Sequence, residues 1–163
     1  MTLAFRVYGI AEGMGSKRAF VPKGWTRPIV TDSNRSLKSW QQLVREAAAD
    51  AIRQQTWTLL EGPVRLLVAF YFPRPKSLPK RVVANTRSVD VDKLARAVAD
   101  ALTGLVYRDD VLVCELLAAK YYAAASEVPH VDVRVEPTVG QRPSEWPQAP
   151  APLFQEPLFA EGR

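Results

Sequence analysis

Residues 88–110 read SVDVDKLARAVADALTGLVYRDD, and this stretch decides how the middle of the chain folds. After Asp92 the apolar residues recur at the spacing of one helix face, at Leu94, Ala97, Val98, Ala101, Leu102 and Leu105. Gly104 suits the left-handed conformation that ends many helices. The pattern predicts an amphipathic helix that begins after Asp92 and ends at Gly104, followed by a turn and an apolar strand from residue 111 to 122.

Three aspartates flank this helix. If residues 89–91 are extended, Asp90 and Asp92 point their carboxylates from one face, about 7 Å apart, and Asp110 precedes the next apolar run. Such oxygen ligands suit Mg²⁺, which retains waters for a substrate phosphate. A returning helix that brings the three acids together would make a site for phosphodiester hydrolysis. Arg96, one helical turn beyond Asp92, would stabilise negative charge there.

A purely structural interpretation explains the same residues. Asp92 would cap the helix that follows it, Arg96 would be its ion-pair partner, and Asp109 and Asp110 would be turn residues. Spacing alone favours this interpretation, because short motifs often match by chance.

The wider pattern resembles the RusA family of Holliday junction resolvases, which are endodeoxyribonucleases. The matching segments are Asp90-Val91-Asp92-Lys93-Leu94, Arg96-Ala97, Asp100-Ala101-Leu102-Thr103-Gly104, Asp109-Asp110, Glu115-Leu116, Lys120 and, upstream, Phe72-Pro73-Arg74-Pro75-Lys76. The resemblance covers roughly residues 3–136 and is far more specific than a pair of aspartates. It departs at residues 14–18, MGSKR, where the family has a proline-rich basic signature.

The resemblance implies an Mg²⁺-dependent nuclease that cuts four-way DNA, with Mn²⁺ as a substitute ion. The family's three metal-binding acids fall on Asp90, Asp92 and Asp110, and its assisting lysine falls on Arg96. Arginine keeps the positive charge, but its planar guanidinium group differs in shape from the compact ammonium group of lysine. Since a four-way junction is two-fold symmetric and needs two matched cuts, the expected partners are branched DNA and a second copy in a homodimer.

Basic residues gather in the first part of the chain. The net charge is +5, and residues 1–120 hold 19 Lys and Arg against 11 Asp and Glu. Such a surface attracts phosphates, although a scattered basic surface is also often simply solvated. The cations expected to bind DNA are Lys17, Arg18, Arg74, Lys76, Lys80, Arg81, Arg87 and Lys120. Five of them lie in the acid-free loop at residues 73–87, which leads directly to Asp90.

The remaining patterns predict one α/β domain, mixed α+β in detail, over residues 1–136. We expect a small mixed sheet of about four strands packed against two main helices. Strands are predicted at residues 3–8, 64–72, 111–122 and 131–135, and a helix at 37–55, after a basic loop at 13–40. His130 is expected to be exposed and incidental.

Residues 137–163 form a proline-rich tail that we expect to be flexible. Gln155, Leu158 and Phe159 resemble the peptides that dock bacterial replication proteins on the sliding clamp, although the apolar pairs could instead pack on this protein. No apolar run approaches the roughly 20 residues that cross a bilayer. We therefore expect a cytoplasmic protein with no membrane partner.

Two other functions stay open from the residues alone. The basic loops could belong to a non-catalytic module that binds branched or single-stranded DNA, with structural aspartates. Alternatively, the enzyme could act on a different phosphate substrate, such as a flap or a nucleotide.

Overall fold

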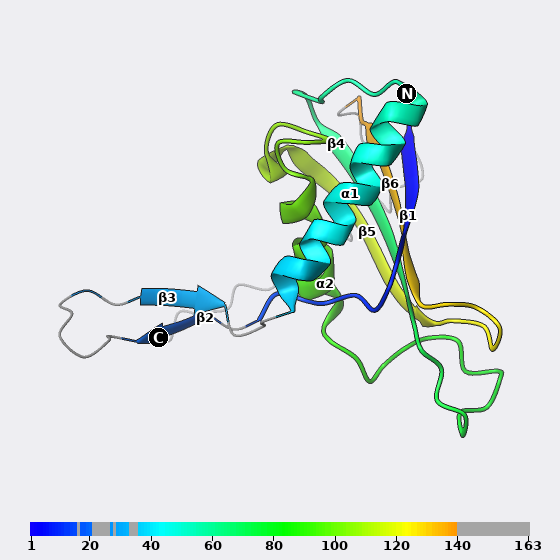
Figure 1. Ribbon diagram of the computed structural model, residues 1–163. Coiled ribbons are helices and arrows are strands. Elements are labelled where there is room, and N and C mark those ends of the chain that lie inside the picture. The colour runs from blue at the N-terminus through cyan, green and yellow to red at the C-terminus, as the bar shows by residue number, and fades with distance from the viewer. Residues whose placement is uncertain (16, 21–26, 28, 33–35, 140–163) are drawn as a thin grey trace, which may run out of the picture.

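The structure, a computed structural model, describes residues 1–15, 17–20, 27, 29–32 and 36–139. Its elements are β1 (Leu3–Tyr8), β2 (Lys17–Phe20), β3 (Ile29–Asp32), α1 (Leu37–Gln55), β4 (Val64–Phe72), α2 (Val91–Leu102), the 3₁₀ turn η1 (Asp110–Leu112), β5 (Val113–Tyr122) and β6 (His130–Pro137). Four strands form one sheet in the order β1-β6-β4-β5. Figure 1 shows this sheet with both helices beside it, which confirms the predicted mixed sheet and two-helix architecture.

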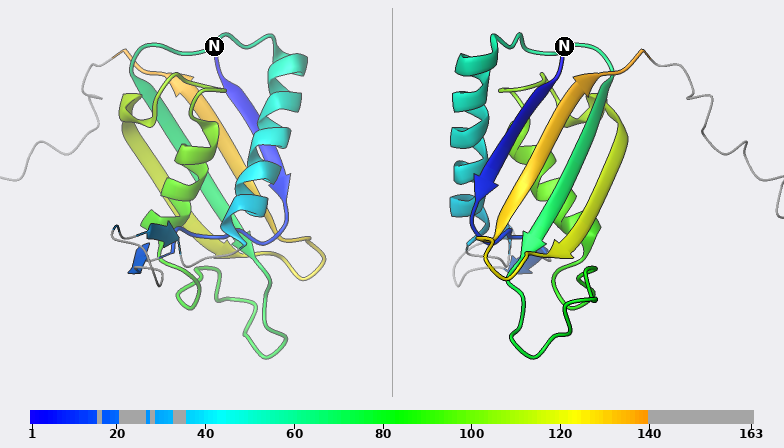
Figure 2. Two further views of the ribbon diagram at one scale, coloured as in Figure 1. Left: turned by 60° about the vertical axis from the view of Figure 1, so that its left-hand side comes forward. Right: turned by 90° about the vertical axis from the view of Figure 1, so that its right-hand side faces the viewer.

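Both helices cover the same face of the sheet (Figure 2, left). In β4, buried residues alternate with half-buried ones, because successive side chains of a strand point to opposite faces. The buried set, which includes Val64, Leu66 and Phe70, faces α1 and α2. The core therefore lies between the sheet and its helical layer, and α1 contributes an apolar stripe that includes Trp40 and Val44.

The parallel connection from β4 through α2 to β5 determines where Asp90, Asp92 and Asp110 lie. Strands β4 and β5 pair in parallel, whereas β4–β6 and β1–β6 are antiparallel. Two parallel neighbours require the chain to travel back along the sheet between them, and here α2 makes that return. Consequently the loop after β4 lies at one end of the sheet and the turn before β5 at the other (Figure 2).

The predicted basic loop at residues 13–40 contains a two-stranded ribbon instead. β2 and β3 pair antiparallel, with Lys17 opposite Asp32 and Phe20 opposite Ile29. The ribbon leaves the body of the molecule at the end where α1 begins (Figure 1). The alternation in these short strands is too brief to distinguish them from a loop by sequence alone.

Three local predictions were wrong. Residues 89–91 are not a strand, because α2 begins at Val91. The strand predicted from residue 111 begins at Val113, after η1. His130 is buried rather than exposed, with its ring stacked on Tyr71 at 4.4 Å between centroids.

Across the ranges that the structure describes, no helix has the length and apolar character needed to cross a membrane.

Candidate active site

Asp90 and Asp92 lie at the N-terminus of α2. Asp90 has extended backbone angles (φ −57°, ψ 138°) in the position before the helix, and Asp92 is in the first turn. The Asp90 side chain makes no capping hydrogen bond, and its Oδ2 lies 3.1 Å from Lys93 Nζ. A carboxylate in the first turn is stabilised by the helix dipole. Both side chains are exposed and accessible to a ligand.

The capping interpretation of Asp92 does not hold. Asp90, and not Asp92, occupies the cap position. Arg96 is exposed one turn further along α2, yet no ion pair joins it to Asp92 in the part of the chain that the structure describes. The Asp92 carboxylate is therefore not committed to a structural salt bridge.

Arg74 holds the basic loop in shape. Its guanidinium donates to three main-chain carbonyls, those of Ala123 (3.3 Å), Pro79 (3.2 Å) and Val82 (2.9 Å). It also lies over the Tyr122 ring, 5.6 Å from the centroid. The guanidinium carries five N–H donors on a planar group, which suits it to several acceptors in different directions. The structure thus gives Arg74 a role in folding the loop, and its predicted DNA contact remains a prediction.

Asn85, which sequence reasoning missed, shapes the last turn before Asp90. It is buried, and its Oδ1 accepts from the backbone N–H groups of Arg87 (3.0 Å) and Ser88 (3.2 Å). This is the turn that Asn side chains commonly form with the residues that follow them. The Asn85 N–H also donates to the Lys120 carbonyl at 3.1 Å, which joins the loop to β5. The Asn85-to-Ser88 spacing was a signal available in the sequence.

Lys120 completes the support of this segment. It projects from β5, and its Nζ donates to the carbonyls of Ser88 (3.3 Å) and Val89 (2.9 Å). Lys120 is half-buried, and these two acceptors satisfy two of the three donors of its ammonium group. Lys120 therefore fixes the backbone that leads into Asp90, so its predicted DNA contact remains a prediction alongside an evident structural role.

Four cations of the loop are left on the surface. Lys76, Lys80, Arg81 and Arg87 are exposed, and none of them forms an ion pair within the described residues. The loop that carries them connects the end of β4 to Asp90 at the N-terminus of α2 (Figure 2). Uncompensated cations next to exposed carboxylates are suited to binding a phosphodiester backbone.

The chain before the ribbon also packs on this end of α2. Met14 N–H donates to the Lys93 carbonyl at 3.1 Å. A Cβ on Gly13 would stand 2.4 Å from Val89 Cγ1, so only glycine allows this approach. Lys17 and Arg18 follow on β2, and their side chains lie outside what the structure describes.

Asp110 does not join Asp90 and Asp92 within one chain. The twelve residues of α2 span about 18 Å at 1.5 Å per residue, and Asp110 lies in η1, beyond the far end of that helix. The expected meeting of the three acids is therefore wrong for a single chain. The cause is the parallel crossover, which returns the chain to the opposite end of the sheet before β5 begins.

The turn that carries Asp110 is rigidly anchored. Tyr107 is fully buried and its hydroxyl donates to the Ala99 carbonyl at 2.9 Å. Burial raises the pKa of Tyr107, and the nearby charges of Asp110 and Asp100 raise it further. Arg108 N–H donates to the Leu60 carbonyl at 2.9 Å. Asp110 is thus an exposed carboxylate held on a fixed turn.

The carboxylates of this site are chemically suited to a divalent metal, but too few of them lie together in one chain. Carboxylate oxygens are the ligands that hard divalent cations prefer. Within the ranges 1–15, 17–20, 27, 29–32 and 36–139, no group of three or more His, Cys, Asp or Glu side chains is placed to hold a metal ion. A single copy therefore does not supply the complete ligand set that the sequence predicts.

Comparison with known proteins identifies the class of this chain. The family model described as "Endodeoxyribonuclease RusA" matches residues 14–136, so the chain is an endodeoxyribonuclease, a hydrolase that acts on DNA. A relative from Bacillus subtilis (strain 168), named "Uncharacterized protein YqaN", is 30% identical over 143 residues, which are 82% of this chain and 94% of the relative. The chain belongs to the RusA family, which implies the resolution of Holliday junctions.

Proposed function

We propose that this protein cuts four-way DNA junctions by Mg²⁺-dependent hydrolysis, in DNA recombination and repair. The observation that carries the proposal is the N-terminus of α2, where Asp90 and Asp92 are exposed and the preceding loop is pinned by Arg74, Asn85 and Lys120. Preorganised carboxylates next to unpaired cations are what phosphodiester hydrolysis requires.

In this proposal Asp90, Asp92 and Asp110 hold Mg²⁺, with Mn²⁺ as a substitute. Divalent-metal chemistry in such a site activates a water and stabilises the departing oxygen. Arg96 lies on α2 one turn beyond Asp92, on the same helix face, and neutralises charge on the scissile phosphate.

The DNA backbone is held by the exposed loop cations Lys76, Lys80, Arg81 and Arg87, which carry no competing ion pair within the described residues. Lys17 and Arg18 are proposed to add contacts from the ribbon, which lies at the same end of the molecule (Figure 1). Each such contact contributes affinity that falls with salt.

A homodimer supplies the missing acid. Because one chain keeps Asp110 a helix length away from Asp92, we propose that each site combines Asp90 and Asp92 with the partner's Asp110. Two such sites, related by a two-fold axis, match the symmetry of a four-way junction. This arrangement makes a dimer a requirement for cleavage and not only for pairing the two cuts.

The test is incubation of the full-length protein with an end-labelled four-way junction, in Mg²⁺ or in EDTA. We expect paired symmetric nicks in Mg²⁺ only, and none with Asp92→Asn, which should bind the junction as the unmutated protein does. Asp50→Asn makes the same chemical change at an exposed position of α1, where Asp50 pairs with Arg53, and this control should retain cleavage. Nicking in EDTA, or by Asp92→Asn at the normal rate, would contradict the proposed chemistry.

A docking role for Gln155, Leu158 and Phe159 on a replication sliding clamp stays a proposal, since these residues lie outside the described part of the chain. A pull-down of purified clamp by the full-length protein, with Leu158→Ala and Phe159→Ala together as the control, tests it directly.

A further inference from the structure

The first turn of α2 carries a lysine where a helix favours an acid. Asp90 occupies the position before the helix, so Val91, Asp92 and Lys93 are its first three residues. The partial positive charge of a helix N-terminus stabilises carboxylates and opposes cations. The third helical position is also the one from which a glutamate or glutamine reaches back to the cap residue. Lys93 is therefore unfavourable for the helix on both grounds.

Asp90 also lacks the interaction that its position offers. An aspartate before a helix commonly accepts a hydrogen bond from a backbone N–H of the first turn. The Asp90 side chain makes no such bond, and its Oδ2 instead lies 3.1 Å from Lys93 Nζ. The two side chains are 69% and 45% exposed, and ion pairs as exposed as this one contribute little to stability. The pair thus replaces a capping hydrogen bond without a matching gain in stability.

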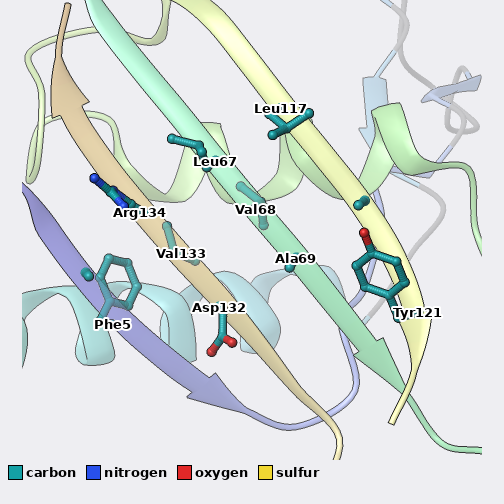
Figure 3. Close-up of a pocket in the computed structure, with 11 residues that line it drawn as sticks. Phe5, Leu67, Val68, Ala69, Leu117, Tyr121, Asp132, Val133 and Arg134 are labelled. Carbon is teal, nitrogen blue, oxygen red and sulfur yellow. The ribbon is translucent and has the colours of Figure 1, made fainter. Parts of the chain in front are cut away.

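Ion pairs on the strands do not displace a backbone interaction in this way. Asp132 and Arg134 of β6 are among the residues that line the apolar hollow on the sheet face opposite α1 and α2 (Figure 3). Asp132 accepts two hydrogen bonds from Arg6, at 2.7 and 2.9 Å, and Arg134 pairs with Glu136 at 3.0 Å. Side chains that stand out of a sheet leave its backbone ladder intact. Residues that break local rules without a structural gain are expected at functional sites, and the first turn of α2 is such a place.

The chain before the ribbon holds the backbone of Lys93. The Lys93 carbonyl accepts from the Met14 N–H at 3.1 Å, and a Cβ on Gly13 would stand 3.3 Å from Lys93 Cβ. Glycine therefore allows the two segments to pack closely at the start of the lysine side chain. The backbone of Lys93 is fixed, and its ammonium stays within reach of Asp90.

We propose that Lys93 is a positioning residue of the nuclease site and acts as a built-in counter-ion of its carboxylates. Its ammonium turns Asp90 away from the backbone N–H groups of the helix and takes the place of a cation there when no metal is bound. The inference rests on the proposed function, in which Asp90 and Asp92 bind Mg²⁺ beside the DNA. A cation at this place lowers the repulsion between the carboxylates and an approaching phosphate, and it also competes with a divalent ion. Lys93 therefore favours DNA binding without metal and weakens metal binding without DNA.

The first measurement is the affinity of the full-length protein for Mn²⁺ alone, from the electron paramagnetic resonance signal of the free ion. Lys93→Gln should bind Mn²⁺ about three- to tenfold more tightly than the unmutated protein, because a nearby positive charge no longer repels the ion. Lys93→Arg keeps the charge and should bind Mn²⁺ as the unmutated protein does. Lys38→Gln is the matched control, since it makes the same change in the first turn of α1, and it should leave the Mn²⁺ affinity unchanged.

The second measurement is junction affinity in EDTA, by fluorescence anisotropy, together with thermal melts. Lys93→Gln should bind the junction about threefold more weakly, or weaker still. Its melting temperature should not fall, because the change removes a cation from a helix N-terminus. Opposite signs of the two affinity changes identify a counter-ion, since the loss of a simple phosphate contact would leave the Mn²⁺ affinity unchanged.

Three results would each overturn the inference: an Mn²⁺ affinity that Lys93→Gln does not raise, a junction affinity in EDTA that it does not lower, or a lower melting temperature, which would assign Lys93 a structural role. None of these measurements depends on cleavage. An unmutated protein that binds junctions but does not nick them would therefore contradict the proposed function and not this inference.

Discussion

Lys120 Nζ donates to the Val89 carbonyl across 2.9 Å, and this bond ties the end of β5 to the residue before Asp90. Lys120→Met keeps the aliphatic stem but removes the donors, and leaves two carbonyls without a partner. We expect the variant to lose about 1–3 kcal/mol of unfolding free energy and at least tenfold in junction cleavage. Urea denaturation and the nicking assay measure these effects.

The matched control is Lys76→Met, which removes a lysine from the exposed part of the same loop. It should change stability by less than about 0.5 kcal/mol. If Lys120→Met were as stable as the unmutated protein and lost only salt-sensitive DNA binding, Lys120 would be a DNA contact and not a support.

Arg74→Lys should loosen the whole basic loop, because a single ammonium cannot replace a fork that reaches three carbonyls. We expect faster limited proteolysis between residues 75 and 87, with cut sites identified by mass spectrometry. Arg81→Lys, an equivalent change at an exposed position, should leave the proteolysis rate unchanged. Equal rates in the two variants would remove the supporting role of Arg74.

Junction affinity should become less sensitive to salt when loop cations are removed. Lys80→Gln with Arg81→Gln should reduce the slope of log affinity against log salt by about 1.8, which corresponds to about 0.9 for each lost phosphate contact. Fluorescence anisotropy with labelled junction DNA measures the slope. Arg53→Gln, at the far end of α1 in an ion pair with Asp50, should keep the original slope, and an unchanged slope in the double variant would exclude these two contacts.

Stability should depend on pH through Glu115. The Arg65 guanidinium, and then the Thr138 hydroxyl, hold the pKa of Glu115 below its ordinary value of 4.5. A lowered folded-state pKa contributes stability that is complete above the unfolded-state pKa and is lost as the pH falls through the folded-state pKa. The advantage of the unmutated protein over Glu115→Gln should therefore be largest above pH 4.5 and shrink below it. Thermal melts between pH 3 and pH 7 test this. The pH dependence of the stability of Thr138→Val should lie between that of the unmutated protein and that of Glu115→Gln.

Much of the fold could be predicted because its elements are strongly periodic. The alternation of Val64, Leu66, Val68, Phe70 and Phe72 predicts a strand that is buried on one face, and the structure places it inside the sheet. The stripe of α1 was equally clear. The ribbon of β2 and β3 was not, because four-residue strands contain too few positions for a period to emerge.

The identity of the site residues could be predicted from the sequence, but their arrangement in space could not. The spacing of Asp90, Asp92 and Asp110 identified the family but could not show that a parallel crossover separates the third acid from the first two. The Asn85 turn is local and could have been predicted from the sequence, whereas the supporting role of Lys120 depends on β5 lying against the loop, and that long-range contact leaves no local pattern. His130 was expected to be exposed for the same reason, since Tyr71 covers it from another strand.

The most direct test of the proposed composite site mixes two inactive chains. Asp92→Asn and Asp110→Asn are co-expressed with different tags, and the mixed dimer is purified and incubated with a four-way junction in Mg²⁺. If Asp110 acts in the partner's site, one site of the mixed dimer carries both changes and the other carries none. We predict single nicks from the mixed dimer and none from either variant alone. A mixed dimer as inactive as its parents, from a protein whose unmutated form cuts junctions, would show that each chain supplies its own three acids and would contradict the account.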